Sequence, residues 1–302
     1  MGYLSQKKRQ EHINIFLKTS IFVVLSATIC ALFGRESKTL SYFTDWYFQF
    51  YFLLLCVFVF ALFVRRWLYA FVLFLFIVIN FVFLSSFINI FLNSTAQGTD
   101  NLNLAYRKRG ADILSSVQTA KENNIEVLAI NTLTEIPPIE NEDYYISPQD
   151  VTKEKSFILS RTAPNQGGKV YFSSKKEASY MIIPQGNKTI LVLNIDFSDL
   201  QEKEEETVYN NLAKFVQQQN MPIIIVGDFG LVPWSKSFQK FLRESGLEIK
   251  NRVILSNGTE KINIFRRPTL NVLGYKTLGL NEIKILSEPT TGDYLFLFKL
   301  VL

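Results

Sequence analysis

Three long apolar stretches near the N-terminus constrain this chain more than any other feature. They cover residues 13–33, 46–64 and 68–91. Each is long enough to cross about 30 Å of hydrocarbon as a helix that rises about 1.5 Å per residue. The alternative, a set of buried core helices, fits poorly with three such stretches in succession, rich in Phe, Leu and Val. The sequence therefore predicts three transmembrane helices.

Basic residues near the ends of these stretches predict how the chain is oriented. Lys7, Lys8 and Arg9 precede the first stretch, and Arg65 and Arg66 separate the second from the third. Lys and Arg are enriched in cytoplasmic loops of membrane proteins. We therefore expect a multi-pass membrane protein with a cytoplasmic N-terminus and an extracytoplasmic C-terminal domain.

The charge of the chain is distributed unevenly between a membrane domain (1–92), a short polar linker (93–101) and a globular domain (102–302). Of 32 Lys and Arg and 27 Asp and Glu, only 8 and 3 lie before residue 100, which leaves 24 of each after it. The net charge of +5 therefore belongs to the membrane part. Domains that bind nucleic acid usually carry a basic excess, so the expected partner is the lipid bilayer and not nucleic acid.

The globular domain alternates between helix-like and strand-like segments, which is typical of an α/β or α+β sandwich. Apolar residues at helical spacing predict helices over 111–123, 202–219 and 236–245. Short apolar or β-branched runs predict strands over 127–130, 157–159, 170–172, 180–183, 190–195, 223–226, 282–286 and 294–301.

One strand end carries a resemblance to a known family. The segment 223–230, Ile-Ile-Ile-Val-Gly-Asp-Phe-Gly, is followed by Pro233, Trp234, Ser235 and a helix. This segment resembles the Gly-Asp-Phe-Asn strand end and Pro-Trp-Ser helix start of the endonuclease/exonuclease/phosphatase superfamily. The chain looks most like its bacterial membrane-anchored branch with three N-terminal spans, which implies an inner-membrane protein with a periplasmic domain.

The resemblance also implies a fold and a chemistry. The fold is an α+β four-layer sandwich, with two central β-sheets flanked by helices. Members of the superfamily cut phosphoesters with Mg²⁺, which carboxylates and amides hold, and a His–Asp arrangement acts at the scissile bond. These residue types suit the task, because a hard cation prefers oxygen ligands and hydrolysis needs charge neutralisation at the phosphoryl group.

Taken position by position, the resemblance implies a catalytic site that has lost most of its functional residues. Asn103, Asp228 and Asp293 match the superfamily pattern. The remaining positions differ: Thr132 stands at the metal-binding Glu, Asp196 at a His, Gly230 at the Asn after Gly-Asp-Phe, Asn271 near an Asp-His pair, and Tyr294 at the last His. Loss of every histidine matters most, since an imidazole is the usual general base.

The single histidine of the chain, His12, does not repair this loss. It precedes the first apolar stretch and is expected on the cytoplasmic side, across the membrane from the domain. The retained residues also have structural interpretations, since Asp228 can cap a turn and Asp293 can accept local backbone hydrogen bonds.

Three functions are compatible with the sequence. The leading hypothesis is a membrane-anchored pseudoenzyme, without a cofactor, that binds a protein partner or small ligand at the inherited cleft. One alternative is an active phosphoesterase that holds Mg²⁺ or Mn²⁺ with Asp196, Asp228 and Asp293. The other is a subunit of a larger membrane complex.

Overall fold

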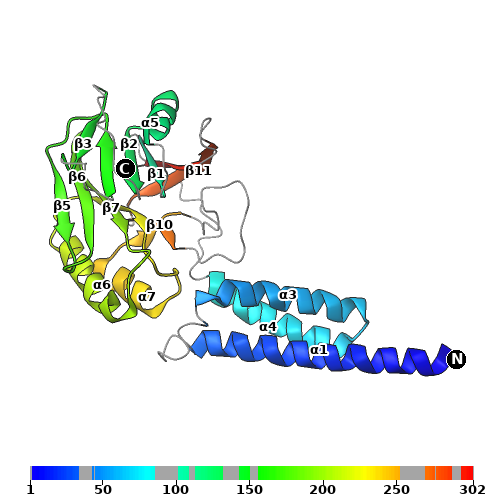
Figure 1. Ribbon diagram of the computed structural model, residues 1–302. Coiled ribbons are helices and arrows are strands. Elements are labelled where there is room, and N and C mark those ends of the chain that lie inside the picture. Colours follow the sequence, from blue (N-terminus) through cyan, green and yellow to red (C-terminus); the bar gives the residue numbers. More distant parts are fainter. Residues whose placement is uncertain are drawn as a thin grey trace. The chain divides into compact units, whose positions relative to one another are not determined.

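A computed structural model of the protein contains two compact units (Figure 1). One unit comprises Met1–Ile88 with Trp234–Lys236, and the other comprises Asn89–Pro233 with Ser237–Leu302. The structure describes residues 2–33, 43, 45–85, 101–108, 113–131, 143–149, 156–251, 269–275, 277–287 and 294–301.

The described residues of the N-terminal unit form the helices α1 (Gly2–Phe33), α3 (Tyr47–Phe63) and α4 (Trp67–Ser85). Leu17, Leu54 and other apolar side chains from all three helices form a common core. By length and composition, α1 and α4 can cross a membrane, whereas α3 is a shorter apolar helix of 17 residues. Two of the three predicted spans are therefore supported on these grounds, and the predicted end of the third span lies outside the described residues.

The C-terminal unit contains two mixed six-stranded sheets. In strand order, the first has β11 (Gly279–Ser287), β12 (Tyr294–Val301), β1 (Asn101–Arg107), β2 (Val127–Asn131), β4 (Ser156–Ser160) and β3 (Tyr145–Ser147). The second has β5 (Gln166–Tyr171), β6 (Glu177–Gln185), β7 (Lys188–Asp196), β8 (Ile223–Asp228), β10 (Leu270–Gly274) and β9 (Glu248–Ile249). Among the described strands, only the pairs β1–β2 and β7–β8 are parallel.

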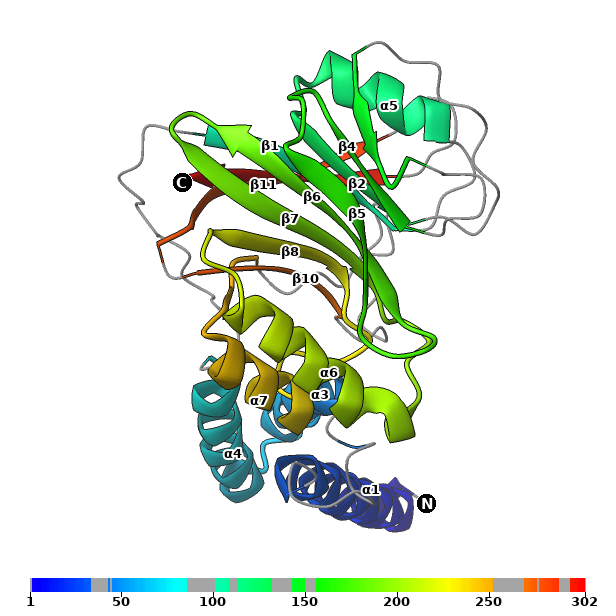
Figure 2. The ribbon, with the colours of Figure 1, turned by 90° about the vertical axis from the view of Figure 1, so that its left-hand side faces the viewer.

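Helices cover the outer faces of the two sheets (Figure 2). Helix α5 (Ile113–Glu122) packs on the first sheet, where Val117 joins the same cluster as Leu128 of β2. Helices α6 (Glu202–Gln217) and α7 (Lys236–Ser245) pack on the second sheet, where Leu212 joins Leu193 of β7. The prediction of two central sheets flanked by helices is confirmed.

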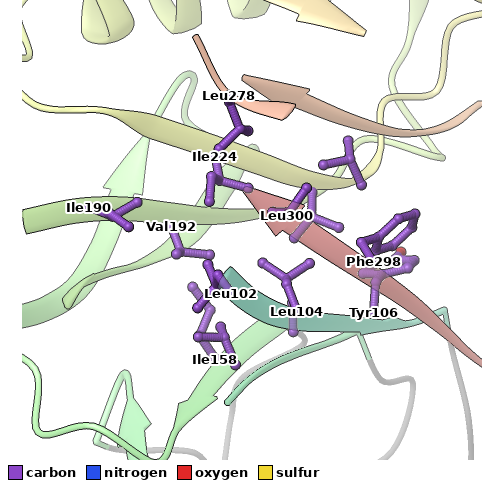
Figure 3. Packing of buried hydrophobic residues seen from close by; sticks show 14 of the residues in the cluster. Leu102, Leu104, Tyr106, Ile158, Ile190, Val192, Ile224, Leu278, Phe298 and Leu300 are labelled. Carbon is purple, nitrogen blue, oxygen red and sulfur yellow. The ribbon is translucent and has the colours of Figure 1, made fainter. Parts of the chain in front are cut away.

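The main core lies between the two sheets (Figure 3). Leu102, Leu104 and Tyr106 alternate along β1 and meet Val192 of β7 and Ile224 of β8 in one buried cluster. Such alternation is expected when one face of a strand is directed at a core. Strands β2 and β8, which run parallel to β1 and β7 respectively, are buried along their whole length. Such burial is typical of strands covered on both faces.

The predicted linker extends one residue too far, because β1 begins at Asn101. The rest of the linker, at 93–100, lies outside the described residues. Strands β1, β3, β9 and β10 were not predicted from the sequence. β3 and β9 have only three and two residues, too few to show a period.

Candidate functional site at the carboxyl ends of the strands

The carboxyl ends of the two parallel strand pairs lie at the same edge of the sandwich. The side-chain amide of Asn131, at the end of β2, donates a 3.0 Å hydrogen bond to the carbonyl oxygen of Ile195, near the end of β7. Asp196 and Asp228 are direct register partners at the ends of β7 and β8. The ends of β2, β7 and β8 therefore place polar residues together. Lys108, which directly follows β1, is the fourth polar residue of this group.

The side chains of these residues face the space between the sheets. Val192 and Val226 belong to the inter-sheet core. Since side chains alternate along a strand, Asp196 and Asp228 point to the same side as these valines. By the same rule, Lys108 points to the side of Tyr106, which also belongs to that core.

The Asp228 carboxylate is the most buried charge in this group and is paired with Lys108. Asp228 is 1 % exposed, and its Oδ2 accepts a hydrogen bond from the Lys108 ammonium, whose side chain is 16 % exposed. The other oxygen, Oδ1, accepts a 2.9 Å hydrogen bond from the backbone N–H of Gly230. Both carboxylate oxygens therefore have a donor within the chain.

The environment holds the pKa of Asp228 below its ordinary value. Burial alone would raise the pKa of this carboxyl, because it disfavours the charged form. The Lys108 charge, together with hydrogen bonds from Lys108, Thr269 and Gly230, outweighs the burial and lowers the pKa. Asp228 is therefore an ionised, fully engaged carboxylate at neutral pH.

Asp196 lies in a more open setting than its neighbour. Its Oδ1 accepts a 3.1 Å hydrogen bond from the backbone N–H of Ser198, two residues along the chain. This bond is typical of an Asp that begins a turn. The pairing of Asp196 with Asp228 places two carboxylates on adjacent strands at one edge.

Gly230 is required by the backbone at its position. Its φ is +70°, in the left-handed region, and an added Cβ would lie 2.1 Å from the carbonyl oxygen of Phe197. Real Cβ atoms do not approach an oxygen so closely, so Asn cannot be accommodated here without a backbone shift. The turn at Gly230 in this chain therefore accommodates glycine, and an Asn side chain there would require the backbone to move.

A network of buried polar side chains joins the two sheets next to these residues. Asn131 donates to the Tyr106 hydroxyl (3.0 Å) as well as to Ile195. Asn194 of β7 donates to the carbonyl oxygens of Ile130 (3.0 Å) and Phe157 (3.1 Å). Both asparagines are fully buried, and their Nδ2 groups bridge β-strands of opposite sheets, whereas their Oδ1 atoms have no hydrogen-bond partner among the described residues.

The structure separates Asn103 and Asn271 from this group. Asn103 lies near the start of β1, and its amide donates to the carbonyl of Asn124, just before β2, at the amino ends of the strands. Asn271 lies between Leu270 and Val272, both of which belong to the inter-sheet core, so its side chain points to the opposite face of the sheet. Neither residue lies with Asp228 on the inter-sheet side.

The remaining predicted positions give less information. Tyr294 is the first residue of β12 and pairs with Ser287. Thr132 and Asp293 lie outside the described residues. The three-carboxylate arrangement of Asp196, Asp228 and Asp293 is therefore described only for its first two members.

Sequence reasoning missed Lys108 and Asn194. A usable signal for Lys108 was the alternation Leu102, Leu104, Tyr106, which continues inward to residue 108 and marks the carboxyl end of β1. Asn194 could have been noticed as the only polar residue within the apolar run 190–195.

The described residues at this edge, as they are arranged, do not fit a divalent cation. Within the described part of the chain, no group of three or more His, Cys, Asp or Glu side chains is placed to hold a metal ion. An ion bound by Asp228 would have to displace the Lys108 ammonium or lie beside it, and like charges at that distance repel.

Comparison with known proteins shows the fold but gives no match in sequence. No family model matches the chain, and no curated protein does. A solved endonuclease/exonuclease/phosphatase family protein from Bacteroides thetaiotaomicron is similar over 67% of this chain and 95% of its own, with 12% identity and a TM-score of 0.50.

Two further solved structures are similar to the same extent. A functionally unknown conserved protein from Enterococcus faecalis V583 matches over 66% of this chain and 99% of its own (12% identity, TM-score 0.51). D. rerio TDP2, complexed with a single-strand DNA product, matches over 67% and 99% (9% identity, TM-score 0.51). The chain is therefore similar in fold to endonuclease/exonuclease/phosphatase family proteins.

Proposed function

We propose that this chain is a membrane-anchored domain of endonuclease/exonuclease/phosphatase fold that has lost phosphoester hydrolysis and acts as a binding or scaffold module. Its ligand is a protein partner or small molecule outside the cytoplasm, bound at the inherited cleft, and it needs no cofactor. Nucleic acid is not among the proposed ligands, because the domain carries no basic excess.

One observation carries the proposal: the Asp228 carboxylate is engaged by Lys108 and Gly230 within the chain. A carboxylate that binds a metal ion or polarises a water needs a free lone pair aimed at that ligand. The Gly230 turn supports the same conclusion, because its close approach to Phe197 leaves no room for an amide side chain there.

The membrane anchor in this proposal consists of three spans, with α3 as the short one. Helices α3 and α4 are joined at Arg65 and Arg66, a basic turn that favours the cytoplasmic side. A helix of 17 residues is at the lower limit for a span. In this topology, the N-terminus is cytoplasmic and the C-terminal unit is periplasmic, in the inner membrane of a bacterial cell.

Hydrolysis by the full chain tests the proposal. The wild type and Asp228→Ala are purified in mild detergent and incubated with bis(p-nitrophenyl) phosphate and p-nitrophenyl phosphate, each with Mg²⁺ or Mn²⁺. We expect the two proteins to release nitrophenol at the same background rate. Metal-dependent release by the wild type that is lost in Asp228→Ala would contradict the proposal.

The register pairing of Asp196 with Asp228 favours a second candidate, an active phosphoesterase with a reworked carboxylate site. Two carboxylates on neighbouring strands offer the oxygen ligands that Mg²⁺ and Mn²⁺ prefer. This candidate requires divalent-cation binding that depends on both residues. Calorimetric titration that detects no such binding at millimolar metal would exclude it.

A further inference from the structure

A buried carboxylate requires a positive charge or several hydrogen-bond donors close by. Asp228 has both, and they come from its own chain. A charge removed from water is costly unless it is paired and hydrogen-bonded. Asp228 is 1 % exposed and has Lys108 on one oxygen and Gly230 on the other. The positive charge comes from the end of β1, in the other sheet, 120 positions away in the sequence.

This ion pair differs from the other ion pairs whose two partners are both described residues. In each of the others, at least one partner is more than a third exposed. An example is Lys176 with Asp199, whose side chains are 8 % and 76 % exposed. Only Lys108 and Asp228 are both mostly withdrawn from solvent, at 16 % and 1 %. Most surface ion pairs contribute little to stability, whereas breaking a buried one leaves an uncompensated charge.

Removal of the ammonium would leave an arrangement of oxygens suited to a cation. Asp228 would lie in a buried position with no positive charge beside it, and Asp196 would lie next to it in register and on the same inter-sheet side. Two adjacent carboxylates repel each other unless a cation lies between them. A divalent ion supplies that charge and accepts oxygen ligands.

We infer that the Lys108 ammonium is a built-in substitute for a divalent cation at Asp228. The wild-type chain binds no divalent ion at this carboxylate, and replacing Lys108 by an uncharged residue opens a site that takes Mn²⁺. The inference rests on the proposed function in one respect, since both place the lost chemistry at Asp228, but its test does not measure hydrolysis.

The experiment uses Mn²⁺ alone as the probe and the full chain in detergent. Free Mn²⁺ is followed by electron paramagnetic resonance, because its signal falls when the ion binds. Lys108→Met keeps most of the side-chain volume and removes the charge. The expected result is about one Mn²⁺ bound per Lys108→Met chain with a Kd at or below about 1 mM, as in weak carboxylate sites, and no binding by the wild type.

Two controls separate this site from general carboxylate binding. Lys176→Met removes the lysine of an exposed pair and should bind no more Mn²⁺ than the wild type. The double variant Lys108→Met with Asp228→Asn should lose the new site. The inference is overturned if Lys108→Met binds no Mn²⁺, or if the double variant binds as much as Lys108→Met does.

A second measurement applies if Lys108→Met does not fold without metal. In that case the inference predicts that Mn²⁺ restores its folding, measured by circular dichroism, and failure to restore it counts against the inference. The wild type gives an independent check, because it and Asp228→Asn should show the same Mn²⁺ response. Wild-type Mn²⁺ binding that Asp228→Asn abolishes would overturn the inference, while the proposed loss of hydrolysis would stand unless hydrolysis were also found.

Discussion

Asn131 and Asn194 each donate a hydrogen bond from the side-chain amide to the strand that carries the other residue. Asn131 Nδ2 donates to the carbonyl of Ile195, and Asn194 Nδ2 donates to the carbonyl of Ile130, both at 3.0 Å. The two residues thus form a reciprocal link between the sheets, close to the ion pair of Lys108 and Asp228. These polar side chains therefore hold the two sheets together at the edge where the candidate site lies.

Breaking this link should destabilise the C-terminal unit. In Asn194→Ala, the buried carbonyl oxygens of Ile130 and Phe157 lose their side-chain donor. We expect a loss of about 2–4 kcal/mol in the free energy of unfolding, because buried polar groups without a partner are costly. Urea unfolding of the detergent-solubilised chain, followed by circular dichroism, measures it. A loss under about 0.5 kcal/mol, as for an ordinary surface substitution, would contradict the role of the link.

The Thr119 hydroxyl, in contrast to the Nδ2 groups of Asn131 and Asn194, is a buried polar group that makes no hydrogen bond within the described residues. Thr119 lies in α5. Thr119→Val keeps the shape and removes the unpaired hydroxyl, so we expect a change between neutral and about 1 kcal/mol of stabilisation. The same urea unfolding measures it, and clear destabilisation would show that the hydroxyl has a partner in solution.

Gly230 and Gly246 form a matched pair for testing how tightly the Gly230 turn packs against Phe197. Their φ angles are +70° and +71°, but a Cβ at Gly230 would meet Phe197 O at 2.1 Å, whereas one at Gly246 would meet nothing within 4 Å. Gly246→Ala should therefore cost only the left-handed strain, about 1–2 kcal/mol. Gly230→Ala should cost at least about 2 kcal/mol more. Equal losses in the free energy of unfolding would show that the contact with Phe197 is not tight.

The ionisation of Asp228 should make stability depend on pH in a defined direction. Its pKa in the folded chain is lowered, despite burial, by Lys108 and by the hydrogen bonds from Lys108, Thr269 and Gly230. A lowered folded pKa adds stability above the unfolded value of about 3.9. That contribution is lost as the pH falls through the folded pKa. We expect the wild type to exceed Asp228→Asn in unfolding free energy at pH 7, and the difference to shrink below about pH 4.

Much of the fold could be predicted from the sequence because many of its strands are apolar runs and its helices have apolar residues at helical spacing. Predicted strands at 127–130 and 190–195 correspond to β2 and β7, and the helix predicted over 236–245 is α7. β10 was missed, although its residues 270–274 are all buried. It is a short run with a Gly at its end, and only pairing with β8 identifies it as a strand.

The candidate site could be predicted only in part. Asp228 was identified from its motif, but the motif says nothing about Lys108, which becomes a neighbour only when the two sheets pack together. Asn103 was assigned from the resemblance to the superfamily pattern, and the register of β1 with β2 places it at the amino ends of these strands. A local pattern in the sequence can show that a side chain points inward, but it does not show which residue of the opposite sheet it will meet.

An anomalous diffraction experiment shows directly whether Lys108 or a metal ion lies beside Asp228. Crystals of the full chain are grown with Mn²⁺, and an anomalous difference map is calculated around Asp228. We expect the Lys108 ammonium to lie beside Asp228, hydrogen-bonded to its carboxylate, with no anomalous peak next to it. An anomalous peak coordinated by Asp228, with Lys108 turned away, would contradict this expectation.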